Sequence, residues 1–429
     1  MKRLLIGITL AAFAAAAEAK PVMVAGKTRY IVTFDGMAKQ ADRDSVLAAQ
    51  GFKAAAHITT GGDTADEISI AIVDVPGDKT PPIAGGRITA VEQDQNVKWI
   101  ESAPTSFQTT PFSFSSVLEG LKRTKVSDIR QSPPSYLMFA KRPELTWGVN
   151  RVHAPAAWAV CARDKVKTCE GAFVKVAVID TGIFAEHSDL LGQVDGGYSA
   201  ITKSENPKDY GDDNEIGHGT HVAGTIAAIR DNKGVVGVAP SARLYSVKVL
   251  DKTGNGNMSD VVDGLVWATK NRMDVVNMSL GAPEGSDALR LAVRKASGSG
   301  VIIVAAAGNS GAAVSFPGAY DDVITVAASD FDDKLAPFSS RGPAVDFIAP
   351  GVDILSTRIG GGWLSLRGTS MACPHVAGLA AIAVAQGYRG LHGPDGVMAQ
   401  LKKAASPLSG EMTMEMQGAG MIDAGKLAR

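Results

Sequence analysis

The sequence has few cysteines, almost no net charge and only one long uninterrupted apolar run. Three cysteines in 429 residues are too few for a disulfide scaffold, and they do not form a zinc ligand set. Lys and Arg total 43 against 44 Asp and Glu, so the net charge of −1 gives no electrostatic reason to expect nucleic acid or an acidic membrane as a partner. Hydrophobic residues make up 45% of the chain, which excludes wholesale disorder.

The apolar run lies at the N-terminus. Two basic residues precede the apolar stretch 4–17, and Ala17-Glu18-Ala19 has the small-x-small pattern of a cleavage site. The stretch is shorter than the roughly 20 residues that span a bilayer, so a membrane anchor is the weaker alternative. We predict a signal peptide over residues 1–19 and a secreted protein, extracellular or periplasmic, without a membrane span.

Export places the cysteines in an oxidising compartment. Cys161 and Cys169 are near in sequence within a polar stretch, which predicts a disulfide that closes a small loop. Cys373 lies among small apolar residues, and we expect it to be a buried free thiol.

Three regions follow the signal peptide. Residues 20–101 have the pattern of a small α+β unit, with strands expected over 29–34 and 67–75 and a helix over 37–50. Residues 102–142 are rich in Ser, Thr, Pro and Phe without a sustained period, which indicates a linker or processing region.

Residues 143–429 alternate apolar runs with helical stretches punctuated by glycine. Continuous apolar runs are typical of strands buried on both faces of a parallel sheet. We therefore predict a doubly wound α/β fold, in which chemistry lies at the carboxyl ends of the strands. The expected strands cover residues 174–179, 243–249, 274–278, 301–306 and 323–327.

An acid, a base and a hydroxyl nucleophile occur in suitable contexts. Asp180 directly follows the expected strand 174–179, His218 lies in the glycine-rich run 217–224, and Ser370 precedes a helical stretch. A serine hydroxyl needs an imidazole to take its proton, and the imidazole needs a carboxylate to orient it and to stabilise its charged form. These three residues predict acyl-transfer chemistry.

Asn309 is the fourth candidate catalytic residue. It follows the expected strand 301–306, in a polar turn with Gly308 and Ser310. Its side-chain amide could donate a hydrogen bond to a tetrahedral oxyanion.

Long motifs make the region from Trp147 to Leu427 resemble the subtilisin-type serine proteases over nearly its whole length. The acid, base and nucleophile also occur in that family's order. The motifs are Trp147-Gly148-Val149, Tyr245-Ser246-Val247-Lys248-Val249-Leu250, Asn277-Met278-Ser279-Leu280-Gly281 and Ala349-Pro350-Gly351.

The resemblance implies a serine endopeptidase that acts on proteins or peptides and needs no cofactor for its chemistry. It implies that Asp180, His218 and Ser370 are the triad and that Asn309 is the oxyanion donor. We also expect a monomer, because no C-terminal binding domain follows Leu427. The resemblance also implies two substrate-pairing edges and a pocket for the residue before the cut. These substrate-binding residues are Gly254, Asn255 and Gly256 on one edge, Ser279, Leu280 and Gly281 on the other, and Ala306, Gly308 and Ser315 in the pocket.

Residues 20–101 resemble the inhibitory pro-domains of the same family, through Tyr30-Ile31-Val32 and Val91-Glu92-Gln93-Asp94. The resemblance implies a ferredoxin-like βαββαβ unit that plugs the cleft, so that the protein is made as a self-processing zymogen. It also implies a structural calcium ion near Asp189 and Asp231, with Pro143 or Glu144 at the family's N-terminal ligand position.

Several alternatives remain open. The protein could be a maturation peptidase with one dedicated target, or a catalytically silent binding homologue. Asp180-Thr181-Gly182 is half of an aspartic-protease signature, but no second copy exists. His218 and His221 lack the spacing of a zinc-protease motif, so His221 and His375 are expected to be packing residues. The acidic residues Asp209, Asp212, Asp213 and Glu215 are expected to form a solvated loop. The alternatives are a subsite for basic side chains and a second cation site.

Overall fold

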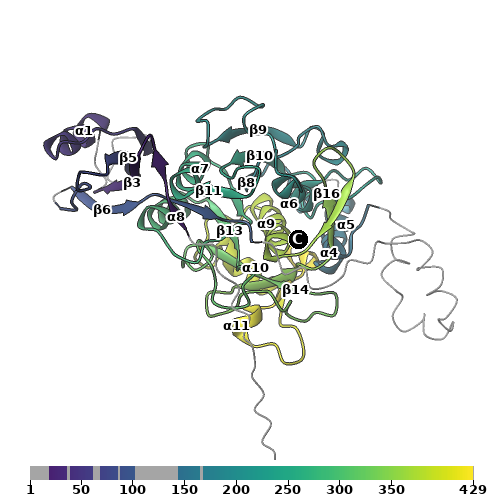
Figure 1. Cartoon of the computed structure of the whole chain (residues 1–429). Coiled ribbons are helices and arrows are strands. Elements are labelled where there is room, and N and C mark those ends of the chain that lie inside the picture. Colours follow the sequence, from purple (N-terminus) through teal and green to yellow (C-terminus); the bar gives the residue numbers. More distant parts are fainter. Residues whose placement is uncertain are drawn as a thin grey trace, which may run out of the picture.

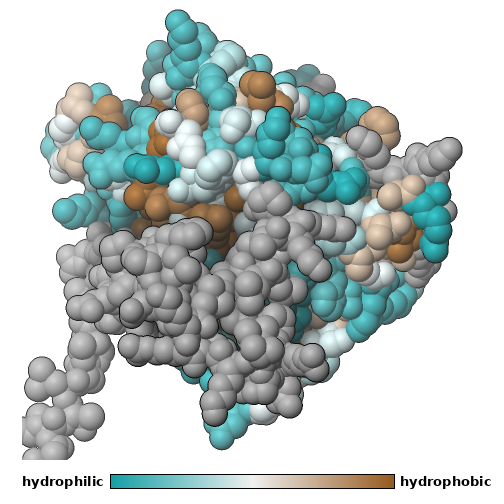
Figure 2. Space-filling view, turned by 90° about the vertical axis from the view of Figure 1, so that its right-hand side faces the viewer, coloured by the Kyte–Doolittle hydropathy of each residue, from teal (hydrophilic) through white to brown (hydrophobic). Residues whose placement is uncertain are grey.

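The computed structural model describes residues 19–35, 39–60, 68–85, 87–101, 144–164 and 168–428. The predicted linker 102–142 lies outside this part of the chain, and so does nearly all of the predicted signal peptide. Among the described residues, no helix is both long and apolar enough to cross a membrane. Figure 2 shows one face of the molecule, on which hydrophilic residues predominate around a smaller hydrophobic area.

Within the described residues, a nine-stranded sheet forms the centre of the larger unit (Figure 1). Its neighbouring strands are parallel, except that the edge strand β18 is antiparallel to β19. The order is β18 (Ala405–Ser406), β19 (Met421–Ile422), β15 (Phe347–Pro350), β14 (Ile324–Ser329), β13 (Ile302–Ala306), β12 (Val275–Met278), β8 (Lys175–Asp180), β10 (Arg243–Lys248) and β9 (Val194–Ser199). The five apolar runs predicted as strands are confirmed as β8, β10, β12, β13 and β14.

Helices cover both faces of this sheet. They are α4 (Trp147–Arg151), α5 (Ala154–Asp164), α6 (His218–Ala227), α7 (Met258–Lys270), α8 (Asp287–Gly298), α9 (Thr369–Ala385), α10 (Val397–Ala404), α11 (Met414–Gln417) and α12 (Ala424–Leu427). A hairpin of β16 (Ile354–Thr357) and β17 (Trp363–Leu366) and the short 3₁₀ turns Thr168–Glu170 and Ser188–Leu190 complete the unit.

The side chains of β8 alternate between two hydrophobic cores, as the period of a strand requires. Val176 and Val178 belong to the core that also contains α6 and α9. Ala177 and Ile179 belong to the core that contains α7 and α8. The central strand is therefore buried on both faces, which explains its unbroken apolar sequence and confirms the doubly wound α/β fold.

The strand order reverses next to β8. The chain passes from β8 to β9 and β10 on one side, and then crosses to β12, β13 and β14 on the other. In doubly wound folds, ligands bind outside the carboxyl ends of the strands at such a reversal. Asp180, the last residue of β8, lies at this position.

The N-terminal unit is a smaller antiparallel sheet with its own core, at the purple end of the chain in Figure 1. It comprises β2 (Met23–Val24), β3 (Lys27–Phe34), β4 (Ala56–Thr59), β5 (Ser69–Pro76), β6 (Ile88–Gln93) and one described helix, α1 (Gln40–Ala49). The order β6-β3-β5-β4 is that of a ferredoxin-like sheet. The described residues between β5 and β6 contain no helix, so the full βαββαβ unit stays a prediction.

A three-stranded sheet joins the two units. In it β7 (Gln95–Lys98) pairs antiparallel with β1 (Lys20–Pro21) on one side and with β11 (Asn255–Asn257) on the other. The chain that follows the N-terminal sheet is thereby added as a strand to an edge of the larger unit.

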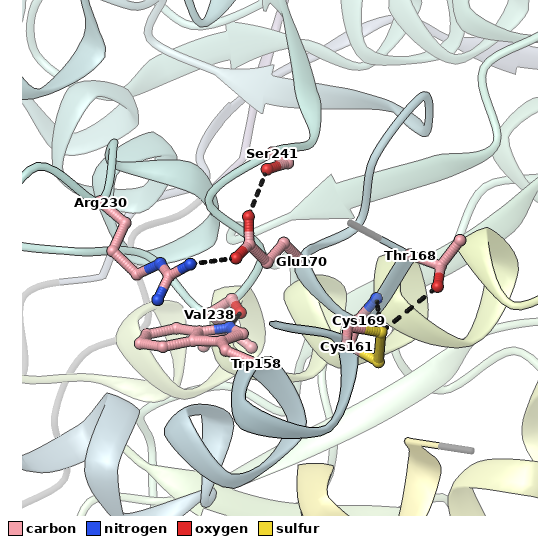
Figure 3. Close-up of a disulfide and its surroundings, with 8 residues drawn as sticks. All are labelled: Trp158, Cys161, Thr168, Cys169, Glu170, Arg230, Val238 and Ser241. Carbon is pink, nitrogen blue, oxygen red and sulfur yellow. Dashed lines mark hydrogen bonds and ion pairs between the residues drawn. A yellow bond between two sulfur atoms is a disulfide. The ribbon is translucent and has the colours of Figure 1, made fainter. Parts of the chain in front are cut away.

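The predicted disulfide between Cys161 and Cys169 is present and links α5 to the turn Thr168–Glu170 (Figure 3). Beside it, Glu170 accepts hydrogen bonds from Arg230 and Ser241, and Arg230 stacks over the ring of Trp158. Cys373 is buried in α9 as a free thiol, as predicted; its Sγ lies 3.2 Å from Asn277 Oδ1 and 3.4 Å from Val304 O. Burial raises the pKa of this thiol.

Candidate active site

Asp180 and His218 are brought together by β8 and the first residue of α6. His218 Nδ1 lies 2.8 Å from Asp180 Oδ1 and 3.0 Å from Oδ2, and both side chains are buried. Asp180 Oδ1 also accepts a hydrogen bond of 2.7 Å from the backbone N–H of Thr181. A carboxylate bound to Nδ1 orients the imidazole and leaves Nε2 for proton transfer.

Glycines allow the close approach of α6 to the end of β8. A Cβ on Gly219 would overlap the carbonyl oxygen of Gly182. Gly217 caps α6 with φ of 69°, in the left-handed region that glycine adopts readily. Any side chain at position 219 would push His218 away from Asp180.

Asp212 fixes the same helix start and departs from the expected solvated acidic loop, whereas Asp213 and Glu215 are exposed as expected. Asp212 is half-buried, and its carboxylate accepts hydrogen bonds from Thr181 Oγ1 at 2.9 Å and from both N and Oγ1 of Thr220 at 3.0 and 2.6 Å. Burial raises its pKa, and these hydrogen bonds oppose that rise. The neighbouring Asp213 pairs with Lys248 Nζ at 2.6 Å. These two acids are therefore structural.

Ser370 is the second residue of α9, and its backbone and side chain both contact Ser279. Ser370 Oγ donates to Ser279 O at 3.1 Å, while Ser279 Oγ donates to Ser370 O at 2.8 Å. Among the described residues, no hydrogen bond joins Ser370 Oγ to His218 Nε2. In unliganded sites such bonds are often formed only when substrate is bound.

Thr369 orients the amide of Asn309. Asn309 Oδ1 accepts from the backbone N of Thr369 at 2.9 Å and from its Oγ1 at 3.0 Å, so Nδ2 is left facing the cleft. There Nδ2 donates to the backbone carbonyl of Glu101 at 3.1 Å. Sequence reasoning missed the role of Thr369, although its position directly before Ser370 is a usable signal.

The two predicted substrate-pairing edges enclose the segment 95–101. On one side β11 pairs with β7, and Gly254 O accepts from the backbone N–H groups of Trp99 at 3.1 Å and Ile100 at 3.4 Å. On the other side Gly281 N donates to Trp99 O at 3.0 Å. A segment of the chain itself thus occupies the place predicted for a peptide substrate.

The predicted pocket residues lie together beside Asn309. A Cβ on Gly308 would stand 2.5 Å from Ser315 Oγ and 3.0 Å from Ser340 Oγ, and a Cβ on Gly281 would stand 2.9 Å from Ser315 Cβ. Ala306 ends β13 directly before this turn. Ser315 therefore packs directly against Gly308 and Gly281, and a side chain at either glycine would displace it.

His221 and His375 lie in the core, as expected of packing residues. Burial lowers the pKa of His221 to about 3 and that of His375 to about 4, so both are neutral. His221 Nε2 contacts the backbone oxygens of Ile354 and Leu364, and His375 Nδ1 contacts that of Met371.

The residues predicted to bind calcium lie at one loop. Asp189 is buried, and its carboxylate accepts from Val235 N and Trp363 Nε1, both at 2.8 Å. Asp231 is exposed and accepts from Lys233 N at 3.0 Å. The described part of the chain contains no group of three or more His, Cys, Asp or Glu side chains that could hold a metal.

Comparisons with known proteins agree with this geometry. The model of the subtilase family matches residues 171–420. Subtilisin DY from Bacillus licheniformis is 49% identical over 230 residues, which are 52% of this chain and 81% of that protein. Subtilisin E from Bacillus subtilis (strain 168) is 47% identical over 245 residues, 56% of this chain and 61% of that protein. Subtilisin Savinase from Lederbergia lenta is 48% identical over 237 residues, 55% of this chain and 82% of that protein.

Proposed function

The chain belongs to the subtilase family, and we propose that it is a secreted serine endopeptidase that hydrolyses peptide bonds through an acyl-enzyme. One observation carries the proposal: the Asn309 amide, held by Thr369, donates to the backbone carbonyl of Glu101, at the end of the segment that lies between the two edges. The buried pair of Asp180 and His218 supports it. Extracellular release is the expected location, and the periplasm is the alternative.

The reaction follows from the positions of these groups. Ser370 Oγ turns from Ser279 O toward His218 Nε2, loses its proton to that nitrogen and attacks the substrate carbonyl carbon. Asp180 stabilises the resulting imidazolium, and Asn309 Nδ2 donates to the oxyanion. When the intermediate collapses, the C–N bond breaks and His218 gives its proton to the leaving amine. Water then hydrolyses the ester by the same two proton transfers.

We also propose that residues 20–101 are an intramolecular inhibitor and that the mature enzyme is a monomer. Glu92 of β6 accepts hydrogen bonds from Ser286 Oγ and Ala288 N at 2.9 and 2.8 Å, at the start of α8. Asp94 accepts from N and Oγ of Ser259 at 3.0 and 2.6 Å, in the first turn of α7. Both side chains satisfy backbone N–H groups that have no partner inside the helix, and β7 then leads the chain into the cleft.

Calcium is a further proposal for the loop 229–235. Two buried carboxylates contact its backbone: Asp189 accepts from Val235 N and Glu144 Oε2 from Asn232 N at 2.7 Å. Neither carboxylate has an ion-pair partner among the described residues, and buried charges are normally paired or bound to a metal. With carbonyl oxygens of the loop, Asp189 and Glu144 would supply the oxygen ligands that calcium prefers. Asp231 faces Lys233 and stays a weaker candidate.

Labelling with a fluorophosphonate tests the enzymatic class. Wild-type protein, processed and freed of its N-terminal unit, should react at one serine, and Ser370→Ala should not react. An unlabelled wild-type protein would favour a catalytically silent binding homologue. Cleavage of a mixed peptide library then separates a general endopeptidase, which cuts many sequences, from a maturation peptidase with a single target.

A further inference from the structure

The segment that fills the cleft has a defined register against both edges. Gly281 N donates to Trp99 O, and Asn309 Nδ2 donates to Glu101 O. The carbonyl that contacts the oxyanion donor belongs to the residue on the acyl side of the bond to be cut. In this register that residue is Glu101, and Ile100 and Trp99 precede it.

An irregularity on the opposite edge sets this register. Asn255 faces Lys98 in the regular pairing of β11 with β7. Beyond that pair, Trp99 N and Ile100 N both donate to Gly254 O, so two residues of the segment oppose one residue of the edge. This arrangement is a β-bulge, a feature that re-aims chains near active sites. Without the extra residue, the carbonyl of Ile100 would reach Asn309 instead.

Trp99 anchors the bulge. Its side chain is 1% exposed, belongs to the core that contains α7 and α8, and donates from Nε1 to Gly256 O at 2.9 Å. A large buried ring with a satisfied indole N–H has few alternative placements. The register is therefore held by packing as well as by backbone hydrogen bonds.

We propose that the enzyme cuts its own chain after Glu101 and that its pocket for the residue before the cut accepts glutamate. The proposal rests on the serine endopeptidase function proposed above. The cut would fall at the start of the region 102–142. The mature chain would begin at Ser102 before any later trimming.

The chemistry of the pocket is compatible with an acidic side chain. The hydroxyls of Ser315 and Ser340 lie next to Gly308, a predicted pocket residue, and Ser310 Oγ lies 3.1 Å from Ser340 Oγ. Arg341 follows Ser340, and its Nη2 lies 3.9 Å from the place of a Cβ on Gly311, two residues after Asn309. Its Nε is buried without a hydrogen-bond partner among the described residues. Hydroxyl donors and a guanidinium favour a carboxylate over an ammonium group.

The proposed self-cleavage is ordinary peptide hydrolysis, with every bond and proton accounted for. Ser370 Oγ bonds to the carbonyl carbon of Glu101, and the C–N bond to Ser102 breaks. His218 delivers the proton to the amine of Ser102. Water then releases Glu101 as a free carboxylate at the end of the N-terminal fragment.

The first test is the mass of the fragments from the full-length precursor, sampled at the earliest times of processing. We expect an N-terminal fragment that ends at Glu101 and a C-terminal fragment that begins at Ser102. A first cut after Ile100, or a first cut inside 103–142 with no fragment ending at Glu101, would overturn the proposal.

The second test changes the side chain. Glu101→Lys should slow the first cut by about tenfold or more, a typical discrimination for a mismatched pocket contact. Glu101→Gln, which keeps the shape without the charge, should be intermediate between the wild type and Glu101→Lys. The exposed Glu411→Lys is the matched control and should process at the wild-type rate. Equal rates for Glu101→Lys and Glu411→Lys would contradict a glutamate-accepting pocket.

The outcomes of these tests distinguish failure of this inference from failure of the proposed endopeptidase function. A protein that reacts with fluorophosphonate and cuts peptides, but processes itself at another bond, is an endopeptidase to which this inference does not apply. A precursor whose processing survives Ser370→Ala in the purified state would refute both the self-cut and the glutamate pocket that rests on it.

Discussion

Thr369 and Asn309 form a two-point contact: the side-chain oxygen of Asn309 accepts from the backbone N of Thr369 at 2.9 Å and from its Oγ1 at 3.0 Å. The amide can satisfy both donors in one orientation only, because its nitrogen cannot accept them. Thr369, which directly precedes the proposed nucleophile Ser370, therefore orients the side-chain amide of Asn309, the proposed oxyanion donor.

We predict that Asn309→Ala lowers kcat by about 10²–10³ and leaves KM nearly unchanged, a magnitude taken from a subtilisin rather than from this chain. The amide acts mainly on charge that appears in the transition state, so substrate binding should hardly suffer. Steady-state kinetics on a peptide substrate measure both parameters. A raised KM with an unchanged kcat would contradict this role.

Thr369→Val should lower kcat less than Asn309→Ala does. The substitution removes the hydroxyl that donates to Asn309 but keeps the shape and the backbone N–H, so the amide keeps one of its two restraints. We expect about a tenfold loss in kcat, with KM unchanged, in line with one lost hydrogen bond to a neutral group. In the Asn309→Ala background the same substitution should have little further effect, since its target is gone. An equal loss in both backgrounds would show that Thr369 acts by another route.

The inhibitory contact of the N-terminal unit should depend on pH through Asp94. Burial beside α7 raises the pKa of Asp94 to about 6. The hydrogen bonds from Ser259 lower this pKa, the charge of Asp260 raises it, and the charge of Arg29 lowers it. We expect the pKa of Asp94 to return toward its ordinary value in the separated unit, where α7 no longer buries it, so the protonated form should bind better. Binding should therefore tighten as the pH falls from about 7 toward 4 and weaken as it rises through 6.

Titration calorimetry of the separated unit, residues 20–101, with mature Ser370→Ala enzyme measures this directly. We expect Kd to be several-fold lower at pH 5 than at pH 8. Asp94→Asn, which cannot ionise, should flatten the profile between these values. A wild-type Kd that stays constant or falls with rising pH would rule out Asp94 as the titrating group.

Loss of the disulfide between Cys161 and Cys169 should lower the free energy of unfolding by about 2–3 kcal/mol. The value follows from the chain entropy of a loop with a sequence separation of 8. Urea titration of Ser370→Ala protein, with and without the paired change Cys161→Ala and Cys169→Ala, avoids self-digestion. Cys373→Ala is the control, because it removes a buried sulfur that forms no disulfide. Its effect on stability measures the cost of the cavity alone, without the loss of a cross-link. Unchanged stability without the bridge would refute the prediction.

Chelation should lower the melting temperature of the mature enzyme if Asp189 and Glu144 hold calcium. A cation bound only by the folded state stabilises it by mass action. We expect calcium to restore the melting temperature in Ser370→Ala protein but not in the same protein with Asp189→Asn. Melting curves that coincide in calcium and in chelator would remove the ion from the loop.

Patterns local in the sequence predicted the framework of the site. The apolar run at residues 176–179 and the acid that follows it were sufficient to place Asp180 at the carboxyl end of a buried strand, where chemistry was expected. The glycines before and after His218 indicated a helix start packed tightly on the sheet. Each of these patterns depends only on residues that are close in sequence. Burial on both faces of a strand, for example, requires nearly every residue of that strand to be apolar.

Contacts between distant segments were not predictable in the same way. Asp212 belongs to a stretch of acids that has the composition of a solvated loop, yet three hydroxyl and amide donors from Thr181 and Thr220 hold it half-buried at the start of α6. The bulge at Trp99 and Ile100 depends on a carbonyl of Gly254, more than 150 positions later in the chain. Composition and period carry no information about such pairings.

Cys373 has a consequence for oxidative folding. A third sulfur in an exported chain can be joined to either of the other two, and a wrong pair would trap a misfolded product. In the finished fold its Sγ lies between β12 and β13 beneath α9, where no oxidant or partner thiol can approach. Its raised pKa also keeps it a thiol, and thiols exchange far more slowly than thiolates. Correct pairing of Cys161 with Cys169 therefore depends on the order of folding events. α9 must pack against the sheet and bury Cys373 before this thiol reacts with either of the other two.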